Sequence, residues 1–241
     1  MDHLLDIIRV RTRLGDTCVG ALGPVDAHPV ILMEGLAAGP LPFGLALASL
    51  GKAFRVFSVP VAGSAGDIHG RPLLEDAYGP SWLGDVLDGL GLPRASLVGL
   101  SRGARTVSQF ASLQPGRVDR VALLSPVGVL PQKWSLLASL RAGGRDLSAG
   151  RPWLGSAALR GIAAPTLLLV GARDGRLSRP SLLNAARRAL PNLVLAAIVP
   201  EAGHALHLDQ PGAVGGVLTD FLIHGGDWCL APDNTHSSRA I

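Results

Sequence analysis

The sequence predicts an α/β domain in which a mostly parallel, twisted sheet of about seven or eight strands is covered by helices on both faces. Short apolar runs alternate with segments whose apolar residues recur every three or four positions, which is the pattern of buried strands and amphipathic helices. Of the 241 residues, 48% are hydrophobic and 17% are charged. This composition is enough for one domain with a core on each side of its sheet.

The first half of the chain begins this alternation. Charged and other residues alternate in Arg9-Val10-Arg11-Thr12-Arg13, as they do on a strand with one solvated face. In 73–90, apolar residues such as Trp82 and Val86 recur at helical spacing, while Asp85 lies on the opposite side. In chain order we expect one or two edge strands within 9–22, a strand at 29–33, a helix at 42–50, a strand at 54–59, a turn-rich segment at 60–70 and a helix at 73–90.

The second half continues the pattern with longer apolar runs. In chain order we expect a strand at 95–98, a helix from 104, strands at 120–124 and 166–171, a helix near 181–190, a strand at 193–199 and a last helix that buries Val214, Val217, Leu218, Phe221 and Leu222.

Composition argues against several classes of function. The net charge is +4, but only Lys52 and Lys133 are lysines and the arginines are scattered, so we expect no nucleic-acid partner. The two cysteines, Cys18 and Cys229, lack metal-ligand spacing, so we expect free thiols, no metal and no cofactor. The N-terminus lacks the apolar core of a signal peptide and no run approaches the ~20 apolar residues of a membrane span. We therefore expect a cytoplasmic protein without a membrane partner.

A candidate nucleophile lies in the pentapeptide Gly99-Leu100-Ser101-Arg102-Gly103, directly after an apolar run. Glycines two residues before and after a serine suit a tight strand-to-helix turn, because a side chain at either position would meet the neighbouring strand or helix. Such a turn strains the serine and exposes its hydroxyl. Read alone, the serine is equally well a turn residue.

Two further residues strengthen this interpretation. Asp174 follows the apolar strand 166–171, and His204 follows the apolar strand 193–199. The segments "RASLVGLSRGA", "APTLLLVGARDGRLS" and "VPEAGHALHLDQP" resemble the nucleophile, acid and histidine segments of the α/β-hydrolase superfamily, in the same order. The likeness spans roughly 25–223. Through "DAYGPSWLGDVLDGLGL" the chain looks most like the small carboxylesterase-type members.

The resemblance implies one domain over 1–224 with a small cap inserted at about 126–164. That segment is rich in Gly, Ser, Arg and Trp and interrupts the alternation of strands and helices. The alternative is an ordinary connection without contact to substrate. The tail 225–241 is polar and turn-rich, and we expect it to be disordered or loosely attached.

The resemblance also assigns roles. Ser101 would be the nucleophile, His204 its general base and later acid, and Asp174 the group that orients the imidazole. Asp209 and His207 lie close to His204 in sequence, and we expect them behind the reacting groups or on the surface. Asp67 is expected in a turn.

Two backbone N–H groups are expected to form an oxyanion hole. These are the N–H of Arg102 and the N–H of Leu36, with Gly35 beside it. The superfamily's usual His-Gly is replaced here by Glu34-Gly35. A carboxylate near a developing oxyanion is unfavourable, so Glu34 is expected to point away or to pair with Arg102. Arg102 itself would bind an acidic substrate group or pair locally.

The expected substrate pocket is apolar. Its candidate residues are Gly35, Leu36, Ala37 and Phe43 on the oxyanion side, and Val127, Trp134, Leu137 and Trp153 from the cap. These residues favour an acyl or alkyl group of modest size; the tryptophans are equally consistent with packing inside the cap.

The sequence therefore predicts a serine hydrolase that cleaves a carboxylic ester, lactone or thioester through an acyl-serine intermediate. Its partner would be a small ester-like molecule, and the protein would be a monomer or homodimer. Acyl transfer, carbon–carbon bond hydrolysis and perhydrolysis use the same residues and stay open. A catalytically weak scaffold that binds a small ligand also stays open, because of Glu34.

Overall fold

Eight strands form a single sheet in the computed structural model, which describes residues 6–35, 47–60, 75–130, 154–175 and 179–225. The strands follow the order β1-β2-β4-β3-β5-β6-β7-β8 across the sheet. Their bounds are β1 Asp6–Thr12, β2 Gly15–Leu22, β3 Pro29–Met33, β4 Arg55–Val59, β5 Ala95–Leu100, β6 Val118–Leu124, β7 Thr166–Gly171 and β8 Leu193–Val199.

Most neighbouring strands run parallel. Among the described strands, β1 with β2 and β2 with β4 pair antiparallel, and the pairings from β4 to β8 are parallel. The predicted fold class is thereby confirmed. Of the one or two edge strands expected within 9–22, the structure has one: β1 lies at the edge of the sheet, whereas β2 turns back and its Gly20–Leu22 pair with β4.

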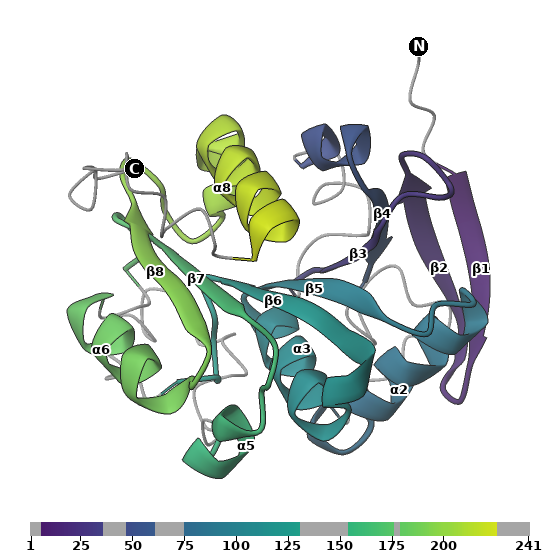
Figure 1. Ribbon diagram of the computed structural model, residues 1–241, viewed down its shortest axis with the longest axis horizontal. Coiled ribbons are helices and arrows are strands. Elements are labelled where there is room, and N and C mark those ends of the chain that lie inside the picture. Colours follow the sequence, from purple (N-terminus) through teal and green to yellow (C-terminus); the bar gives the residue numbers. More distant parts are fainter. Residues whose placement is uncertain (1–5, 36–46, 61–74, 131–153, 176–178, 226–241) are drawn as a thin grey trace, which may run out of the picture.

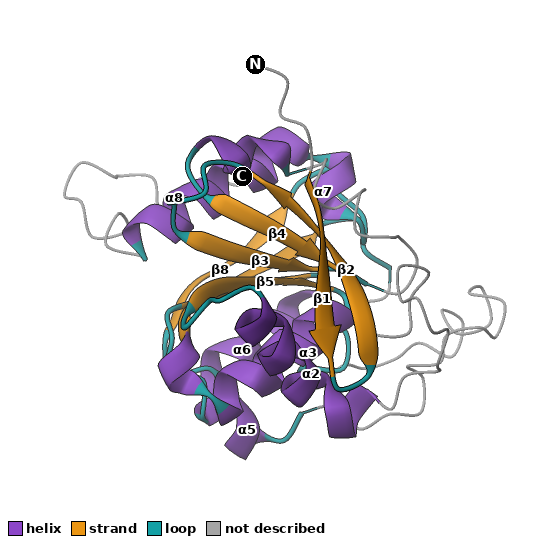
Figure 2. Ribbon diagram, turned by 90° about the vertical axis from the view of Figure 1, so that its right-hand side faces the viewer, coloured by secondary structure: helices purple, strands orange, loops and turns teal. Residues whose placement is uncertain are grey.

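Helices cover both faces of the sheet (Figures 1 and 2). On one face lie α2 (Glu75–Gly89), α3 (Arg102–Leu113), α5 (Ser156–Arg160) and α6 (Arg179–Ala189). On the other lie η1 (Ala48–Lys52), α7 (Leu206–Asp209) and α8 (Pro211–His224). A short turn of helix, η2 (Pro115–Arg117), precedes β6. The helix expected at 42–50 is described only from residue 47, and the described part belongs to the 3-10 helix η1, which Leu47 precedes.

Each face has its own core, because successive strand residues point to opposite sides. Along β3, Ile31 and Met33 pack into the core beneath α2 and α3, whereas Val30 and Leu32 pack into the core that α8 closes. The central strands β5 and β7 are buried along their full length. Such continuous burial explains why these strands read as unbroken apolar runs.

The segment expected to form a cap is described at its two ends, 126–130 and 154–164. Residues 131–153 lie outside the described residues. Leu159 and Ile162, by contrast, are buried in the same core as α3, so the end of the segment belongs to the body of the domain. Among the helices in the described part of the chain, none is both long and apolar enough to cross a lipid bilayer.

Candidate active site

The three candidate residues lie at one edge of the sheet. Strands β5, β7 and β8 are parallel, so their carboxyl ends meet at the same edge. Ser101 directly follows β5, Asp174 comes three residues after β7, and His204 comes five residues after β8. Distant parts of the chain thus converge because the sheet is parallel.

Ser101 occupies a strained turn between β5 and α3. Its φ of 54° and ψ of −114° place it in a region that few non-glycine residues adopt. Hydrogen bonds hold it there: its N–H donates to the Leu124 carbonyl at 2.9 Å, and its carbonyl accepts the Val127 N–H at 3.1 Å. The strain is therefore balanced by bonds to the end of β6 and the loop that follows it.

The two flanking glycines permit close packing around this turn. A Cβ on Gly99 would lie 2.5 Å from the Cα of Ala104 in α3. A Cβ on Gly103 would lie 2.3 Å from the Met33 carbonyl oxygen at the end of β3. Both contacts are shorter than any side chain tolerates, so glycine is required at both positions.

The side chains of Ser101, His204 and Asp174 form one hydrogen-bonded chain. The Ser101 Oγ lies 2.9 Å from His204 Nε2, and His204 Nδ1 lies 2.7 Å from Asp174 Oδ2. An ionised carboxylate only accepts hydrogen bonds, so Nδ1 carries the proton and Nε2 accepts the serine hydroxyl. Asp174 is fully buried, whereas the His204 side chain is 21% exposed. The arrangement can take a proton from Ser101 and stabilise the resulting imidazolium.

The loops that carry Asp174 and His204 are bonded to each other. The Arg173 N–H donates to the Ala202 carbonyl at 2.7 Å, and the Ala172 N–H donates to Val199 at 2.9 Å. An exposed ion pair joins Arg173 to Glu201, and Glu201 has a positive φ of 57°. The acid and the histidine are therefore held as one unit by backbone contacts across β7 and β8.

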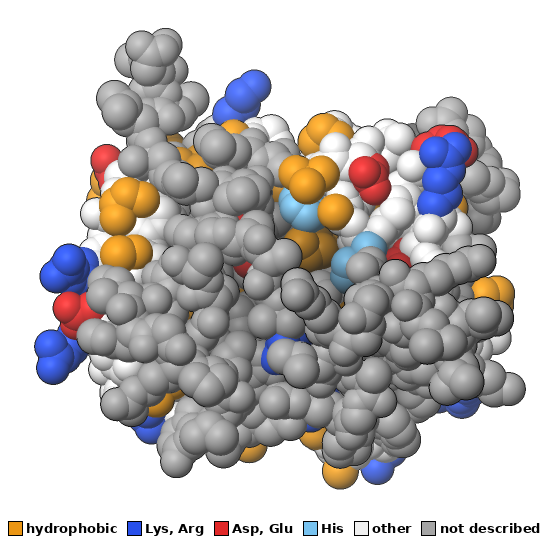
Figure 3. Space-filling view, turned by 180° about the vertical axis from the view of Figure 1, so that it is seen from behind, with side chains coloured by type: hydrophobic (Ala, Val, Ile, Leu, Met, Phe, Trp, Pro, Cys, Tyr) orange, Lys and Arg blue, Asp and Glu red, His pale blue; other side chains and the backbone are white. Residues whose placement is uncertain are grey.

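The end of β3 packs directly against the nucleophile. A Cβ on Gly35 would come within 3.1 Å of the Ser101 Cβ and 3.6 Å of its Oγ. Seen from behind, the molecule shows histidine side chains close to apolar and acidic ones (Figure 3). The loop after β3 thus begins where an oxyanion hole for Ser101 would form.

The chain is similar in sequence to two known carboxylesterases. The chain is 27% identical to carboxylesterase YbfK of Bacillus subtilis over 259 residues, which cover 90% of this chain and 87% of that protein. It is 26% identical to the uncharacterized carboxylesterase nap of the same organism, covering 84% and 81% of the two chains. The chain is thus similar to carboxylesterases over most of its length and has the α/β-hydrolase fold. No family model matches it.

Solved structures share the hydrolase's architecture. The crystal structure of naproxen esterase (carboxylesterase NP) from Bacillus subtilis superposes with a TM-score of 0.80 at 22% identity, over 92% of each chain. The crystal structure of carboxylesterase CesB (YbfK) from Bacillus subtilis gives a TM-score of 0.79 at 25% identity, again over 92% of each chain.

The structure describes some of the other predicted site residues of this hydrolase and not the rest. Val127 is buried and bonded to the Ser101 backbone, and Arg102 is the first residue of α3. Leu36, Phe43, Trp134 and Trp153 lie outside the described residues, as do Ala37, Asp67 and Leu137.

Glu34 is buried despite its charge-bearing side chain. It is 1% exposed, and the Ser58 hydroxyl of β4 lies 3.5 Å from its Oε1, at the upper limit for a hydrogen bond. Its N–H donates to the Val59 carbonyl at 3.3 Å. The expected pairing of Glu34 with Arg102 stays a prediction.

His207 lies inside the molecule. It is 4% exposed, and burial lowers the pKa of its imidazole to about 4, with the nearby His204 acting in the same direction and Asp209 opposing it. His207 is therefore neutral at neutral pH. A surface position for this residue is thereby excluded.

Asp209 is the residue whose contact the sequence did not reveal. Its Oδ2 accepts the backbone N–H of Gly203 at 2.7 Å rather than approaching the His204 ring. The only sequence signal was its spacing of five residues from His204. Within the described ranges, no three His, Cys, Asp or Glu side chains come together in an arrangement that could hold a metal ion.

Proposed function

We propose that this chain hydrolyses carboxylic esters, lactones or thioesters through an acyl-serine intermediate formed on Ser101. The observation that carries the proposal is the continuous hydrogen-bonded chain from the Ser101 hydroxyl through His204 to the buried Asp174. A neutral serine is a weak nucleophile and needs a base within hydrogen-bond reach. Likeness to carboxylesterases over most of the chain supports the choice of ester substrates.

In the first half-reaction, the Ser101 Oγ attacks the carbonyl carbon of the ester while its proton passes to His204 Nε2. The resulting imidazolium is stabilised by Asp174 through the Nδ1–H bond. The tetrahedral intermediate then collapses, and His204 returns the proton to the departing alcohol or thiol. The acyl group remains on Ser101.

In the second half-reaction, water takes the place of the leaving group. His204 removes a proton from the water, the hydroxide adds to the acyl carbon, and collapse releases the carboxylic acid and restores the Ser101 hydroxyl. In each half-reaction His204 first takes a proton and then returns it, in the second one to the Ser101 oxygen.

Negative charge on the carbonyl oxygen needs fixed donors in both steps. In this proposal one donor is the N–H of Arg102, which follows Ser101 at the first position of α3. The second donor is the N–H of Leu36, in the loop that Gly35 begins. The carboxyl of Glu34 would remain on its Ser58 partner, away from this oxygen.

A panel of p-nitrophenyl esters of graded acyl length tests the proposal with wild type and Ser101→Ala. We expect wild-type turnover with a preference for acyl groups of modest size, and none above background in the variant. Labelling by a fluorophosphonate probe should occur at Ser101 and disappear in the variant. Wild-type protein that neither hydrolyses any ester nor takes the label would instead indicate a ligand-binding scaffold.

A further inference from the structure

The peptide unit between Ala202 and Gly203, immediately before His204, is bonded at both of its polar ends. Its carbonyl accepts the Arg173 N–H at 2.7 Å, and its N–H donates to Asp209 Oδ2 at 2.7 Å. One bond comes from the acid loop after β7, and the other comes from α7, which follows His204 in the chain. This peptide plane is therefore fixed from two sides.

The Asp209 contact closes a short ring of chain around the histidine. The chain leaves Gly203, passes through His204 and Ala205, makes the single helical turn of α7 and returns through the Asp209 side chain to the Gly203 N–H. Within the ring, the Asp209 N–H donates to the Ala205 carbonyl at 3.1 Å. The backbone of Asp209 is thus anchored while its carboxylate binds Gly203.

The opposite side of the ring has no free space. A Cβ on Gly171 would lie 2.1 Å from the Gly203 carbonyl oxygen and 2.5 Å from that of Ala202. The loop therefore lies flat against the end of β7. It can move only away from β7, and the two hydrogen bonds of the Ala202–Gly203 peptide resist that movement.

We propose that Asp209 is a positioning residue that holds the His204 loop in register with Ser101, acting through the Gly203 N–H and not through the imidazole. The inference rests on the proposed function, in which His204 is the base. A displacement of the order of 1 Å at a reacting group can cost about a hundredfold in rate. A single bond that orients the preceding peptide is therefore enough to matter for turnover.

In this proposal Asp209 acts through its hydrogen bond to the Gly203 N–H and not through its negative charge. Asp209 is exposed, so solvent screens its carboxylate from His204. Asparagine retains a side-chain oxygen that accepts the Gly203 N–H, although a neutral acceptor binds less strongly than a carboxylate. Alanine removes the acceptor altogether. The two substitutions separate the bond from the charge.

The experiment compares Asp209→Ala, Asp209→Asn and the matched control Asp220→Ala. Asp220 is an exposed acid on α8 that has no hydrogen-bond or ion-pair partner among the described residues. For each protein we would measure kcat and KM on the best p-nitrophenyl ester, the urea midpoint, and amide hydrogen exchange at Gly203. We expect kcat of Asp209→Ala to fall about 10- to 100-fold with little change in KM. Asp209→Asn should lose less, and Asp220→Ala should match wild type.

Amide hydrogen exchange at Gly203 reports on its hydrogen bond to Asp209 independently of enzyme activity. Gly203 exchange should accelerate in Asp209→Ala and stay slow in Asp209→Asn and in Asp220→Ala. Unchanged exchange in Asp209→Ala, or kcat values equal to those of the Asp220→Ala control, would overturn the inference. Equal kcat losses in the alanine and asparagine variants would assign the effect to charge and overturn it as well. A wild-type rate retained by Ser101→Ala would instead overturn the proposed function, and Gly203 exchange would still report on the contact.

Discussion

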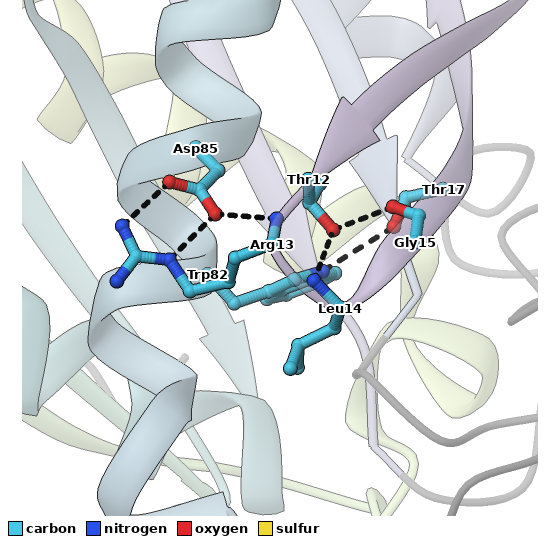
Figure 4. A network of polar contacts seen from close by, with 7 residues as sticks. All are labelled: Thr12, Arg13, Leu14, Gly15, Thr17, Trp82 and Asp85. Carbon is cyan, nitrogen blue, oxygen red and sulfur yellow. Dashed lines mark hydrogen bonds and ion pairs between the residues drawn. The ribbon is translucent and has the colours of Figure 1, made fainter.

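The Arg13 guanidinium binds both carboxylate oxygens of Asp85, at 2.7 and 2.8 Å, and the Arg13 backbone N–H donates to the same carboxylate at 2.8 Å (Figure 4). Beside it, the Trp82 indole N–H donates to the Thr17 hydroxyl at 3.3 Å. These contacts join the β1–β2 hairpin to α2. They attach the antiparallel edge of the sheet to the body of the domain.

Asp85→Asn should lower the free energy of unfolding at neutral pH. The hydrogen bonds from the Arg13 side chain hold the pKa of Asp85 below its ordinary value, so folding favours the charged form. That contribution is present above the unfolded-state pKa of about 3.9 and is lost as the pH falls through the lower, folded-state value. Urea midpoints of wild type and variant should therefore converge in acid. Asp16→Asn is the control, because Asp16 meets Arg9 and Arg11 only at 3.7 and 3.5 Å on an exposed surface.

His207 should make the fold sensitive to mild acid. Its folded pKa of about 4 lies below the ordinary value of 6.5, so the unfolded chain binds a proton first as the pH falls. Stability is then lost below about pH 6.5, by about 2 kcal/mol at pH 5. In His207→Gln the fall in urea midpoint between pH 7.5 and 5 should shrink. The same change at the exposed His224 should leave the pH dependence intact, and an identical result for both variants would contradict the assignment.

Asp174→Asn should reduce turnover far more than Asp209→Asn. Asparagine at 174 cannot accept from Nδ1 with a carboxylate's strength and favours the wrong imidazole tautomer, which costs about 10⁴-fold in a serine protease. Asparagine at 209 retains an acceptor for Gly203. Steady-state kinetics on one ester, with both variants shown to be folded, checks the ranking; a reversed order would make Asp209 the acid.

Gly103→Ala should damage both folding and activity. The added Cβ would lie 2.3 Å from the Met33 carbonyl and 2.5 Å from that of Glu34, and backbone atoms there cannot move aside cheaply. We expect a clear loss of thermal stability and of ester hydrolysis. In Gly216→Ala the Cβ meets nothing within 4 Å, so a gain of about 0.5 to 1 kcal/mol is expected in the middle of α8. Equal effects of the two changes would show that the packing at Gly103 is not limiting.

Much of the fold could be predicted because its central strands are buried on both faces. Such strands read as unbroken apolar runs, and α/β topology fixes which of their ends meet. For this reason 166–171 was assignable, together with the position of Asp174 after it. The run 193–199 is also unbroken and apolar, although β8 is a half-buried edge strand, and it placed His204 after it. The glycines two residues before and after Ser101 indicated the tight turn that this residue occupies.

Features that depend on a single contact could not be predicted. α7 has four residues, too few for a periodic face, so the burial of His207 left no pattern. Gly203 and Asp209 reveal their bond only when the turn between them is known. The place of β2 inside the sheet, between β1 and β4, depends on how tightly the chain reverses at Gly15, where φ is 115°. An alternating pattern of residues indicates a strand, but it does not show which other strands will pair with it.

The order of the strands in the sheet determines which hydrogen bond of the candidate site breaks first on heating or under pressure. Asp174 and His204 follow the adjacent strands β7 and β8, whereas Ser101 follows β5, and β6 separates it from them. Twisting or shearing of the sheet by heat or pressure therefore changes the distance from His204 to Ser101 more than the distance from His204 to Asp174. Inactivation on heating should then precede global unfolding and be reversible, because the acid and histidine move away from the serine together and return together.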